Sequence, residues 1–406
     1  MKNTKLPTAS KLTVVRQLCN YIPNHLVPCL ARETGVDKKA RTFDEWSHIV
    51  SLCYAQVTHS IGLNDVCDAL QLNSGPLSAI RGATPPTRNN FSHANQVRDA
   101  VMGEKLFWAM YAHLGKLSPQ FVSGKAAKRF ARKFERTIHL VDSTTIELIA
   151  SCMDWAKHRR RKAAAKCHLR LDLQSFLPRF AIIDTARDAD AKRAREVCAG
   201  IKDGEIVIFD KAYVDFDHLW DLEQRGVFWV TRAKENLQYE VVESYSVKAG
   251  GKIVSDALIG LKNAGSQKAY PELMRRVVAW VEVDGKERLM TFLSNHLTWS
   301  AESIADLYRC RWQIELFFKW IKQHLRIKSF FGTSENAVKS QIWIAVSVYV
   351  LVAILRKRLK ITASLYEMLQ ILSLTMFERM ALNQLLARTP PDTNSPDSAN
   401  QLFLFD

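Results

Sequence analysis

The sequence predicts an α/β protein in which a core of strands and helices lies between two helical regions. The N-terminal part shows helical periodicity, the middle alternates short apolar strands with helices, and the segment from about 300 to 387 is helical again. Its 406 residues suggest two or three domains at roughly 150 residues per domain. An apolar fraction of 47% is enough to build cores and excludes a wholly disordered chain.

The chain is strongly basic, with 57 Lys and Arg against 41 Asp and Glu and a sequence pI near 9.5. Such a balance favours a polyanionic partner, and nucleic acid is the first candidate. A merely cationic protein without a specific partner is the alternative.

The cysteines and the apolar segments give no sign of secretion or of a membrane protein. The eight cysteines are scattered without a C-x-x-C pair, so we expect a reducing compartment rather than a disulfide framework or a zinc knuckle. No apolar signal-peptide core follows the first Met. The longest uncharged apolar run, Ile342–Leu355, has 14 residues, so we expect a buried core helix.

Residues 1–120 predict a helical DNA-binding domain. Thr42 precedes acidic residues in a way typical of a helix start, and a second helical pattern over 63–70 is followed by the breaker Gly75-Pro76. A third segment, 84–95, is rich in Arg, Asn and Ser. Short helices separated by turns favour a helix-turn-helix-like module. A plain helical bundle with a solvated polar face is the alternative.

The rest of the chain divides by composition into four parts. Residues 121–236 begin with a basic run, Lys125–Arg136, and continue with strands near 137–142, 169–173, 180–183, 206–209 and 228–231 and a helix at 190–199. Residues 237–297 have β character with Gly-marked turns. Residues 298–388 are helical, and 389–406 have the composition of a disordered tail.

Two acids, Asp142 and Asp210, lie in or at the ends of apolar strands. Burying an isolated carboxylate costs several kcal/mol unless a cation neutralises it. Hard carboxylate oxygens suit Mg²⁺ or Mn²⁺ rather than Zn²⁺. The alternative is that each acid caps the following turn. Asp184 also ends an apolar strand and is the best rival to Asp210.

A third acid lies on a predicted helix whose polar face carries one carboxylate among cations. At about 100° per residue, this face contains Tyr308, Arg311, Glu315, Lys319 and Lys322. A surface ladder of i,i+4 ion pairs is the simpler explanation, but it does not account for the cationic excess or for the tyrosine. A phosphodiester backbone held by the basic residues, with Glu315 near a metal, accounts for both.

The spacing Tyr308-x2-Arg311-x3-Glu315-x6-Lys322 resembles the Y-R-E-K signature of the bacterial DDE transposases grouped under insertion sequence four. Val141–Thr144 resembles the strand of the family's first Asp. Asp210-Lys211-Ala212-Tyr213 resembles its second-Asp motif, D-[RK]-G-Y, with Ala212 in place of the usual Gly. Phe228–Arg232 resembles the strand that follows, and Lys166-x-His168 the family's basic-His element.

This resemblance implies a ribonuclease-H-like catalytic core with a β-rich insertion, an N-terminal all-α domain and a helical C-terminal region. It implies that Asp142, Asp210 and Glu315 are the catalytic residues and bind two Mg²⁺ ions, with Mn²⁺ able to substitute. It also implies contacts with DNA from seven side chains: Tyr308, Arg311, Lys322, Lys319, Lys166, His168 and Arg232.

The function implied by the resemblance is cut-and-paste transposition in the bacterial cytoplasm, in association with the nucleoid. The partners would be double-stranded DNA, as terminal inverted repeats and as target, and a second copy of the chain in a homodimeric synaptic complex. A catalytically silent DNA-binding protein derived from a transposase is one alternative. Another ribonuclease-H-like nuclease, such as a junction resolvase, is the other.

Overall fold

The computed structural model describes residues 9–38, 40–58, 60, 62–117, 134–148, 152–159, 162–174, 178–185, 190–283, 286–324 and 330–386. Most of the basic run over 125–136 and the whole tail over 389–406 lie outside the described residues. The chain divides into two compact units. The helical unit contains residues 1–122, 146–164 and 318–405, and the sheet unit contains 123–145 and 165–317.

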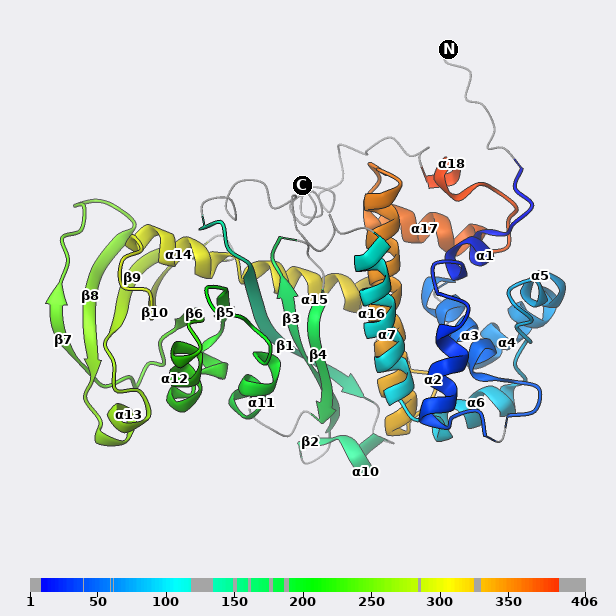
Figure 1. Ribbon diagram of the computed structural model, residues 1–406, viewed down its shortest axis with the longest axis horizontal. Helices are drawn as coiled ribbons and strands as arrows, with labels where there is room; N and C mark the ends of the chain where they lie inside the picture. The colour runs from blue at the N-terminus through cyan, green and yellow to red at the C-terminus, as the bar shows by residue number, and fades with distance from the viewer. Residues whose placement is uncertain are drawn as a thin grey trace, which may run out of the picture. The chain divides into compact units, whose positions relative to one another are not determined.

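The helical unit is built around one long apolar helix, α16 (Glu335–Arg358), on which α3, α6, α7 and α17 pack (Figure 1). Its helices are α1 (Val14–Cys19), α2 (Leu26–Thr34), α3 (Glu45–Thr58), α4 (Leu63–Leu72), α5 (Ser74–Ser78), α6 (Arg88–Val97), α7 (Val101–Leu117), α10 (Met153–Ala156), α17 (Leu365–Thr375) and α18 (Leu382–Leu386). Among the described residues, α16 alone is long and apolar enough to cross a membrane, but 94% of its apolar window is buried within the protein. The predicted core helix over 342–355 is therefore confirmed.

The local signals in the N-terminal helices differ in detail from the predictions. Helix α3 is capped by Asp44, whose Oδ1 accepts a hydrogen bond from the Ser47 amide at 2.8 Å, and not by Thr42. The preceding helix, α4, ends at Leu72 with Asn73 as its C-cap, whereas Gly75 and Pro76 lie in the first turn of α5, where proline is tolerated. Because α3, α6 and α7 share a core with α16, these helices depend on residues more than 200 positions later in the chain.

The sheet unit has a mixed sheet in the order β4-β3-β1-β5-β6-β10-β9-β8-β7, and the short β2 (Lys157–Arg159) pairs with the first residues of β3. Strands β1 (Ile138–Leu148), β5 (Ile206–Phe209) and β6 (Phe228–Arg232) are parallel, whereas β3 (Lys162–Asp172) and β4 (Pro178–Thr185) are antiparallel. Along the chain, β1, β3 and β4 come first, and β5 and β6 follow and run parallel to β1. This order confirms the predicted ribonuclease-H-like core.

The β-rich insertion continues the same sheet rather than forming a separate one. It consists of β7 (Tyr239–Ser244), β8 (Ile253–Leu261), the short helix α13 (Ala264–Ala269), β9 (Met274–Val283) and β10 (Lys286–Ser294). Strand β10 pairs antiparallel with β6 through Phe292–Ser294. The insertion therefore returns the chain to the core sheet directly beside the last parallel strand.

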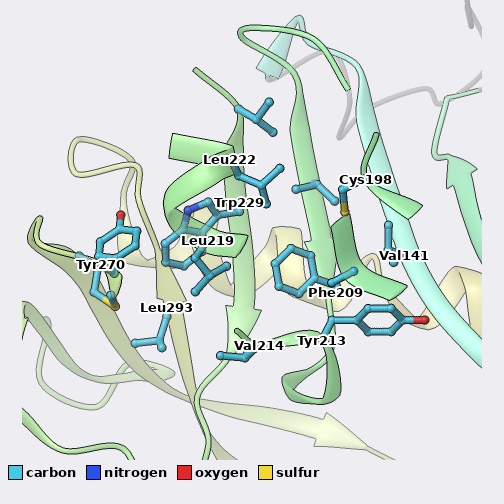
Figure 2. Packing of buried hydrophobic residues seen from close by; sticks show 14 of the residues in the cluster. Val141, Cys198, Phe209, Tyr213, Val214, Leu219, Leu222, Trp229, Tyr270 and Leu293 are labelled. Atoms are coloured by element: carbon cyan, nitrogen blue, oxygen red, sulfur yellow. The ribbon is translucent and has the colours of Figure 1, made fainter. Parts of the chain in front are cut away.

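Helices cover both faces of the sheet (Figure 1). On one face, α11 (Asp190–Val197), the 3₁₀ turn η2 (Lys211–Tyr213) and α12 (Phe216–Gln224) bury a core that includes Val141, Phe209 and Trp229 (Figure 2). On the other face, α14 (Ala301–Arg309) packs against the sheet, and the rings of Tyr308 and Phe292 lie 4.8 Å apart. Since alternate residues of a strand face opposite sides, the residues that follow Val141 and Phe209 face α14.

The predicted helix that carries Tyr308 and Glu315 is two helices. Helix α14 ends at Arg309, and α15 begins at Trp312 and continues to His324. Between them the amides of Cys310, Arg311, Gln313 and Ile314 bond to carbonyls three residues earlier, as in a 3₁₀ turn. Residues three apart eclipse in such a turn, so Tyr308 and Arg311 lie closer together around the axis than an α-helix would place them.

A matched pair of leucines tests the core of the sheet unit. Leu222 is fully buried beside Trp229, whereas Leu289 is half exposed. We expect Leu222→Ala to cost about 2–5 kcal/mol through lost burial and a residual cavity, and Leu289→Ala to cost well under 1 kcal/mol. Thermal unfolding followed by circular dichroism measures both. Equal shifts for the two variants would contradict the position of this core.

Candidate active site

Asp142 and Asp210 are brought together by the register of two parallel strands. In the β1–β5 ladder Val141 is paired with Phe209, and each acid is the next residue along its strand. Both carboxylates therefore lie at neighbouring positions on the face toward α14. The sequence predicted that this strand ends at Asp142, but strand β1 continues to Leu148.

The Asp142 carboxylate is largely buried, with 15% of its side chain exposed. One oxygen accepts a hydrogen bond from the Ser143 amide at 2.8 Å, and the other accepts one from Arg311 Nη1 at 2.9 Å. Burial raises the pKa of Asp142 to about 6; Glu315 and Asp210 add to the rise, although Arg311 and the Ser143 amide oppose it. The two other carboxylates are thus close enough to act on Asp142 electrostatically.

Arg311 links the first and third predicted acids. Its Nη1 pairs with Asp142, and its Nη2 pairs with Glu315, which lies one turn further along the chain on α15. Although burial opposes it, Tyr308, Asp142 and Glu315 raise the pKa of Arg311, so the guanidinium stays charged. A cation with two donors on one face can satisfy two carboxylates at once, which a lysine does less well.

Asp210 has its own set of partners. Tyr308 Oη donates to Asp210 Oδ1 at 3.0 Å, and Arg232 Nε lies 3.5 Å from the same oxygen. Burial, more than the nearby charges, raises the pKa of Tyr308, so the phenol stays protonated and acts as a donor. Arg232 ends β6, the strand next to β5.

A buried polar network supports the two aspartates from the other side of their strands. Asp190, in the first turn of α11, accepts from Ser143 Oγ at 2.9 Å and pairs with Lys166 Nζ at 2.7 Å. His168 Nδ1 lies 3.5 Å from the same Asp190 oxygen and 2.9 Å from Tyr213 Oη. The network therefore joins the residue after Asp142 to the tyrosine three residues after Asp210.

This network changes the interpretation of the basic-His element. His168 is only 2% exposed, and burial lowers its pKa to about 4, so the imidazole is neutral. A buried, neutral ring cannot meet a phosphate, so the predicted DNA contact of His168 does not fit its position. Lys166 is paired with Asp190. The sequence offered no signal for Asp190 as the common partner beyond an acid at a helix start.

The remaining predicted residues lie elsewhere. Asp184, the rival acid, pairs with Arg193 and is not part of the group around Arg311. Lys319 and Lys322 lie on the part of α15 that belongs to the helical unit, where Lys319 is exposed and Lys322 half-buried. The structure thus groups Asp142, Asp210 and Glu315 with Tyr308, Arg311 and Arg232. These six residues are the candidate active site.

The site has carboxylate oxygens that could bind a divalent metal, but these oxygens are paired with the guanidinium groups of Arg311 and Arg232. Among the residues that the structure describes, no three His, Cys, Asp or Glu side chains are already positioned as a metal site. The guanidinium of Arg311 links the two carboxylates that would have to converge. Burial, together with the nearby Glu315 and Asp210, raises the pKa of Asp142, and a group of carboxylate oxygens suits a hard cation such as Mg²⁺.

The raised pKa gives a stability test. Because the folded pKa of Asp142, about 6, lies above its usual value of 3.8, the carboxyl favours folding below pH 4, and this contribution is lost as pH rises through 6. The shift corresponds to roughly 3 kcal/mol. We expect Asp142→Asn to raise the thermal unfolding midpoint at pH 7.5 and the gain to shrink toward pH 4. A lower midpoint at pH 7.5 would contradict this, and exposed Asp217→Asn is the control.

Comparison with known proteins identifies the family of this chain. Residues 133–351 match the family model described as a transposase DDE domain, and residues 10–80 match a domain of unknown function, DUF4372. A putative transposase of Sinorhizobium fredii, y4zB, is 33% identical over 66% of this chain and 75% of its own length. A probable transposase for insertion sequence element IS5377 of Geobacillus stearothermophilus is 28% identical over 55% of this chain and 58% of its own length.

A further transposase and one solved structure complete the comparison. Transposase InsG for insertion sequence element IS4 of Escherichia coli is 26% identical over 45% of this chain and 42% of its own length. A solved piggyBac transposase synaptic complex with hairpin DNA aligns with 98% of this chain and 87% of its own at 9% identity and a TM-score of 0.49. Members of the matched family act on DNA with a divalent metal. The chain belongs to the DDE transposase family and is an enzyme of DNA strand cleavage and transfer.

Proposed function

We propose that this transposase binds the terminal inverted repeats of its own insertion sequence and moves that element by cut-and-paste transposition. The observation that carries the proposal is the grouping of three carboxylates, from β1, from the end of β5 and from α15. Arg311 pairs with Asp142 and Glu315, and Asp210 lies close enough to act electrostatically on Asp142 and on Arg311. Asp142, Asp210 and Glu315 are the residues we assign to catalysis and to two Mg²⁺ ions. Mn²⁺ is expected to substitute, since it prefers the same oxygen ligands.

Bound divalent ions would supply Lewis-acid stabilisation of the scissile phosphate and a more acidic attacking water. The protein's own part is to keep the carboxylates ionised and aligned. Tyr308 orients Asp210 by its hydrogen bond, and the Ser143 amide fixes one oxygen of Asp142. Partial burial of these carboxylates, whose side chains are 15% exposed for Asp142, 27% for Asp210 and 35% for Glu315, strengthens each electrostatic contact.

Arg311 changes partner in this mechanism. Without DNA it neutralises Asp142 and Glu315. Guanidinium binds phosphate in the same two-pronged way as it binds carboxylate, so an incoming phosphodiester competes for it. Transfer of Arg311 to the phosphate frees both carboxylates for metal at the moment when the substrate is present. Arg232 is placed for the same role beside Asp210, and Lys166, Lys319 and Lys322 are further candidates for phosphate contacts.

Sequence recognition is assigned to the N-terminal helices of the helical unit. The solvent face of α6 carries Arg88, Asn89, Asn90, Ser92, His93 and Gln96, all of them exposed. Arginine, asparagine and glutamine are the side chains that read base edges in the major groove. Synapsis of two element ends implies a homodimer on DNA, and a protein that acts on the chromosome is expected in the bacterial cytoplasm with the nucleoid.

Cleavage assays test the catalytic assignment. We expect Asp142→Asn, Asp210→Asn and Glu315→Gln each to lower the rate of Mg²⁺-dependent cleavage at least about a hundredfold on a duplex that carries the terminal repeat. The reason is that mutation of residues that only support metal ligands already lowers metal affinity or activity about 10- to 100-fold. DNA binding should persist. Asp184→Asn, at an acid paired with Arg193, is the matched control and should keep its activity.

Each outcome of these assays is decisive. Full activity in one of the three variants removes that residue from the site. A wild-type protein that binds the repeat but cleaves under no metal condition is a silent descendant of a transposase. Cleavage without joining of the 3′ end to new DNA would indicate a nuclease of the same fold.

The recognition assignment is tested on the full chain, because the N-terminal helices share their core with α16. We expect Arg88→Ala with Asn89→Ala to lower affinity for the terminal repeat at least tenfold, since each good base contact contributes about 1–3 kcal/mol. Affinity for unrelated duplex should change little. Arg32→Ala, on the exposed face of α2, is the control in the same unit. An unchanged preference for the repeat would place recognition elsewhere.

A further inference from the structure

A buried ion pair joins two strands of the insertion on the face of the sheet that α14 covers. Arg275 of β9 and Asp256 of β8 are each 7% exposed, and Arg275 Nε and Nη2 lie 2.5 Å and 2.6 Å from the two carboxylate oxygens of Asp256. Arg275 lies two residues before Val277, which is paired with Phe292, so its side chain is on the same face as the Phe292 ring. That face is the one against which α14 packs.

The same guanidinium also binds the connection between β10 and α14. Arg275 Nη1 donates a hydrogen bond to the carbonyl oxygen of Leu297, three residues before Ser300, the N-cap of α14. A carboxylate takes two of the donors of an arginine, and the fork of the guanidinium leaves a further donor for a third group. Arg275 is therefore bonded to the insertion and to the chain that enters α14.

The core sheet holds this connection at a second point. Asn295 Oδ1 accepts a hydrogen bond from the Trp229 amide at 2.8 Å, and Asn295 Nδ2 donates to the Val227 carbonyl at 3.0 Å. Asn295 thus ties the connection to β6, and Arg275 ties it to the insertion two residues later.

The position of α14 decides the geometry at Asp210. Tyr308 lies near the end of this nine-residue helix and donates to Asp210 Oδ1 at 3.0 Å. The helix rises about 10 Å between Ala301 and Tyr308, at about 1.5 Å per residue. A shift or tilt at its start is therefore carried to Tyr308. A misplacement of about 1 Å at a reacting centre can lower a rate about a hundredfold.

The ion pair is better explained by position than by stability. Desolvation of two buried charges offsets most of their attraction, and apolar side chains of similar volume often replace such a pair without loss of stability. An apolar pair could fill the space between β8 and β9, but it could not donate to the Leu297 carbonyl. What Arg275 adds at this position is the hydrogen bond to the connection.

We infer that Arg275 is a positioning residue for DNA cleavage. It fixes the start of α14 relative to the insertion and so keeps Tyr308 within hydrogen-bonding distance of Asp210. The inference rests on the proposed function, because it takes Asp210 to be a catalytic residue. The insertion thereby sets the geometry of the candidate active site, although none of the six residues of that site belongs to it.

The first experiment separates stability from positioning in the full-length protein. Arg275→Met alone leaves Asp256 buried without its cation, so we expect the thermal unfolding midpoint to fall by roughly 5 °C or more. Asp256→Leu with Arg275→Met should restore the midpoint to within roughly 3 °C of the wild type. The rate of Mg²⁺-dependent cleavage by this double variant should still be about tenfold or more below the wild type, with unchanged affinity for the terminal-repeat duplex.

A second measurement determines whether the loss acts through Tyr308. Tyr308→Phe removes the hydrogen bond to Asp210, so adding the Asp256→Leu and Arg275→Met changes should lower the cleavage rate of this variant less than about twofold further. A merely structural role would give two losses that multiply. That result overturns the inference whatever the stability of the variants.

The control is a second buried ion pair of the sheet unit, in which Arg179 of β4 binds Asp172 of β3 with Nε at 3.0 Å from Oδ2. Asp172→Leu with Arg179→Met removes the same two charged groups and should keep the wild-type cleavage rate. An equal loss in this control overturns the inference. So does a wild-type rate in the Asp256 and Arg275 double variant.

Hydrogen exchange followed by mass spectrometry separates this inference from the proposed function, because it requires no cleavage. The Ile304 amide donates to the Ser300 carbonyl in the first turn of α14. Peptides over 297–309 should exchange about tenfold or more faster in the Asp256 and Arg275 double variant than in the wild type or the control.

The two readouts together give distinct outcomes. Wild-type cleavage together with unchanged exchange and an unchanged rate in the double variant leaves the transposase assignment standing and removes this role from Arg275. Faster exchange in a protein that cleaves no DNA would keep the link between Arg275 and α14 and remove the catalytic assignment.

Discussion

The charge balance between Arg311 and its two carboxylates is the constraint on which the sheet unit depends. Three acids share a partly buried site, and burial, aided by Glu315 and Asp210, raises the pKa of Asp142. Without the guanidinium the carboxylates would lose their cation, and removing the cation from a buried ion pair commonly costs about 3–5 kcal/mol. The β1–β5 register and the 3₁₀ turn before α15 are the structural means that bring the acids to one guanidinium.

The cations that balance these acids are also those that a phosphodiester would attract. Arg311 and Arg232 contact the carboxylates in the absence of DNA, and Tyr308 donates to Asp210. A site that neutralises itself in this way stays folded when empty and gives up its internal ion pairs only to a ligand of equal charge. The same chemistry therefore links the stability of the free protein to the order in which substrate and metal enter.

The sequence predicted the parts that depend on neighbouring residues. The strand over 206–209 is found with the same bounds, and the family is confirmed. Register explains why two strand-end acids meet. Periodicity predicted only that Glu315 shares a helix face with Arg311, and the resemblance implied that it joins the two aspartates. The burial of His168 and the role of Asp190 were not predictable, because both result from contacts between β3, α11 and η2. The turn at Cys310–Arg311 has no Gly or Pro to signal it.

The insertion between Asp210 and Glu315 is best understood as the connection that makes the site possible. After β6 the chain has to reach the opposite face of the sheet to deliver the third acid. Pairing of β10 with β6 returns it to the core sheet, and α14 then crosses that face with Tyr308 against Phe292. Because the return strand pairs with β6 over three residues only, a notch beside Asp210 follows from the same topology. The notch and the third carboxylate are thus two results of one chain path.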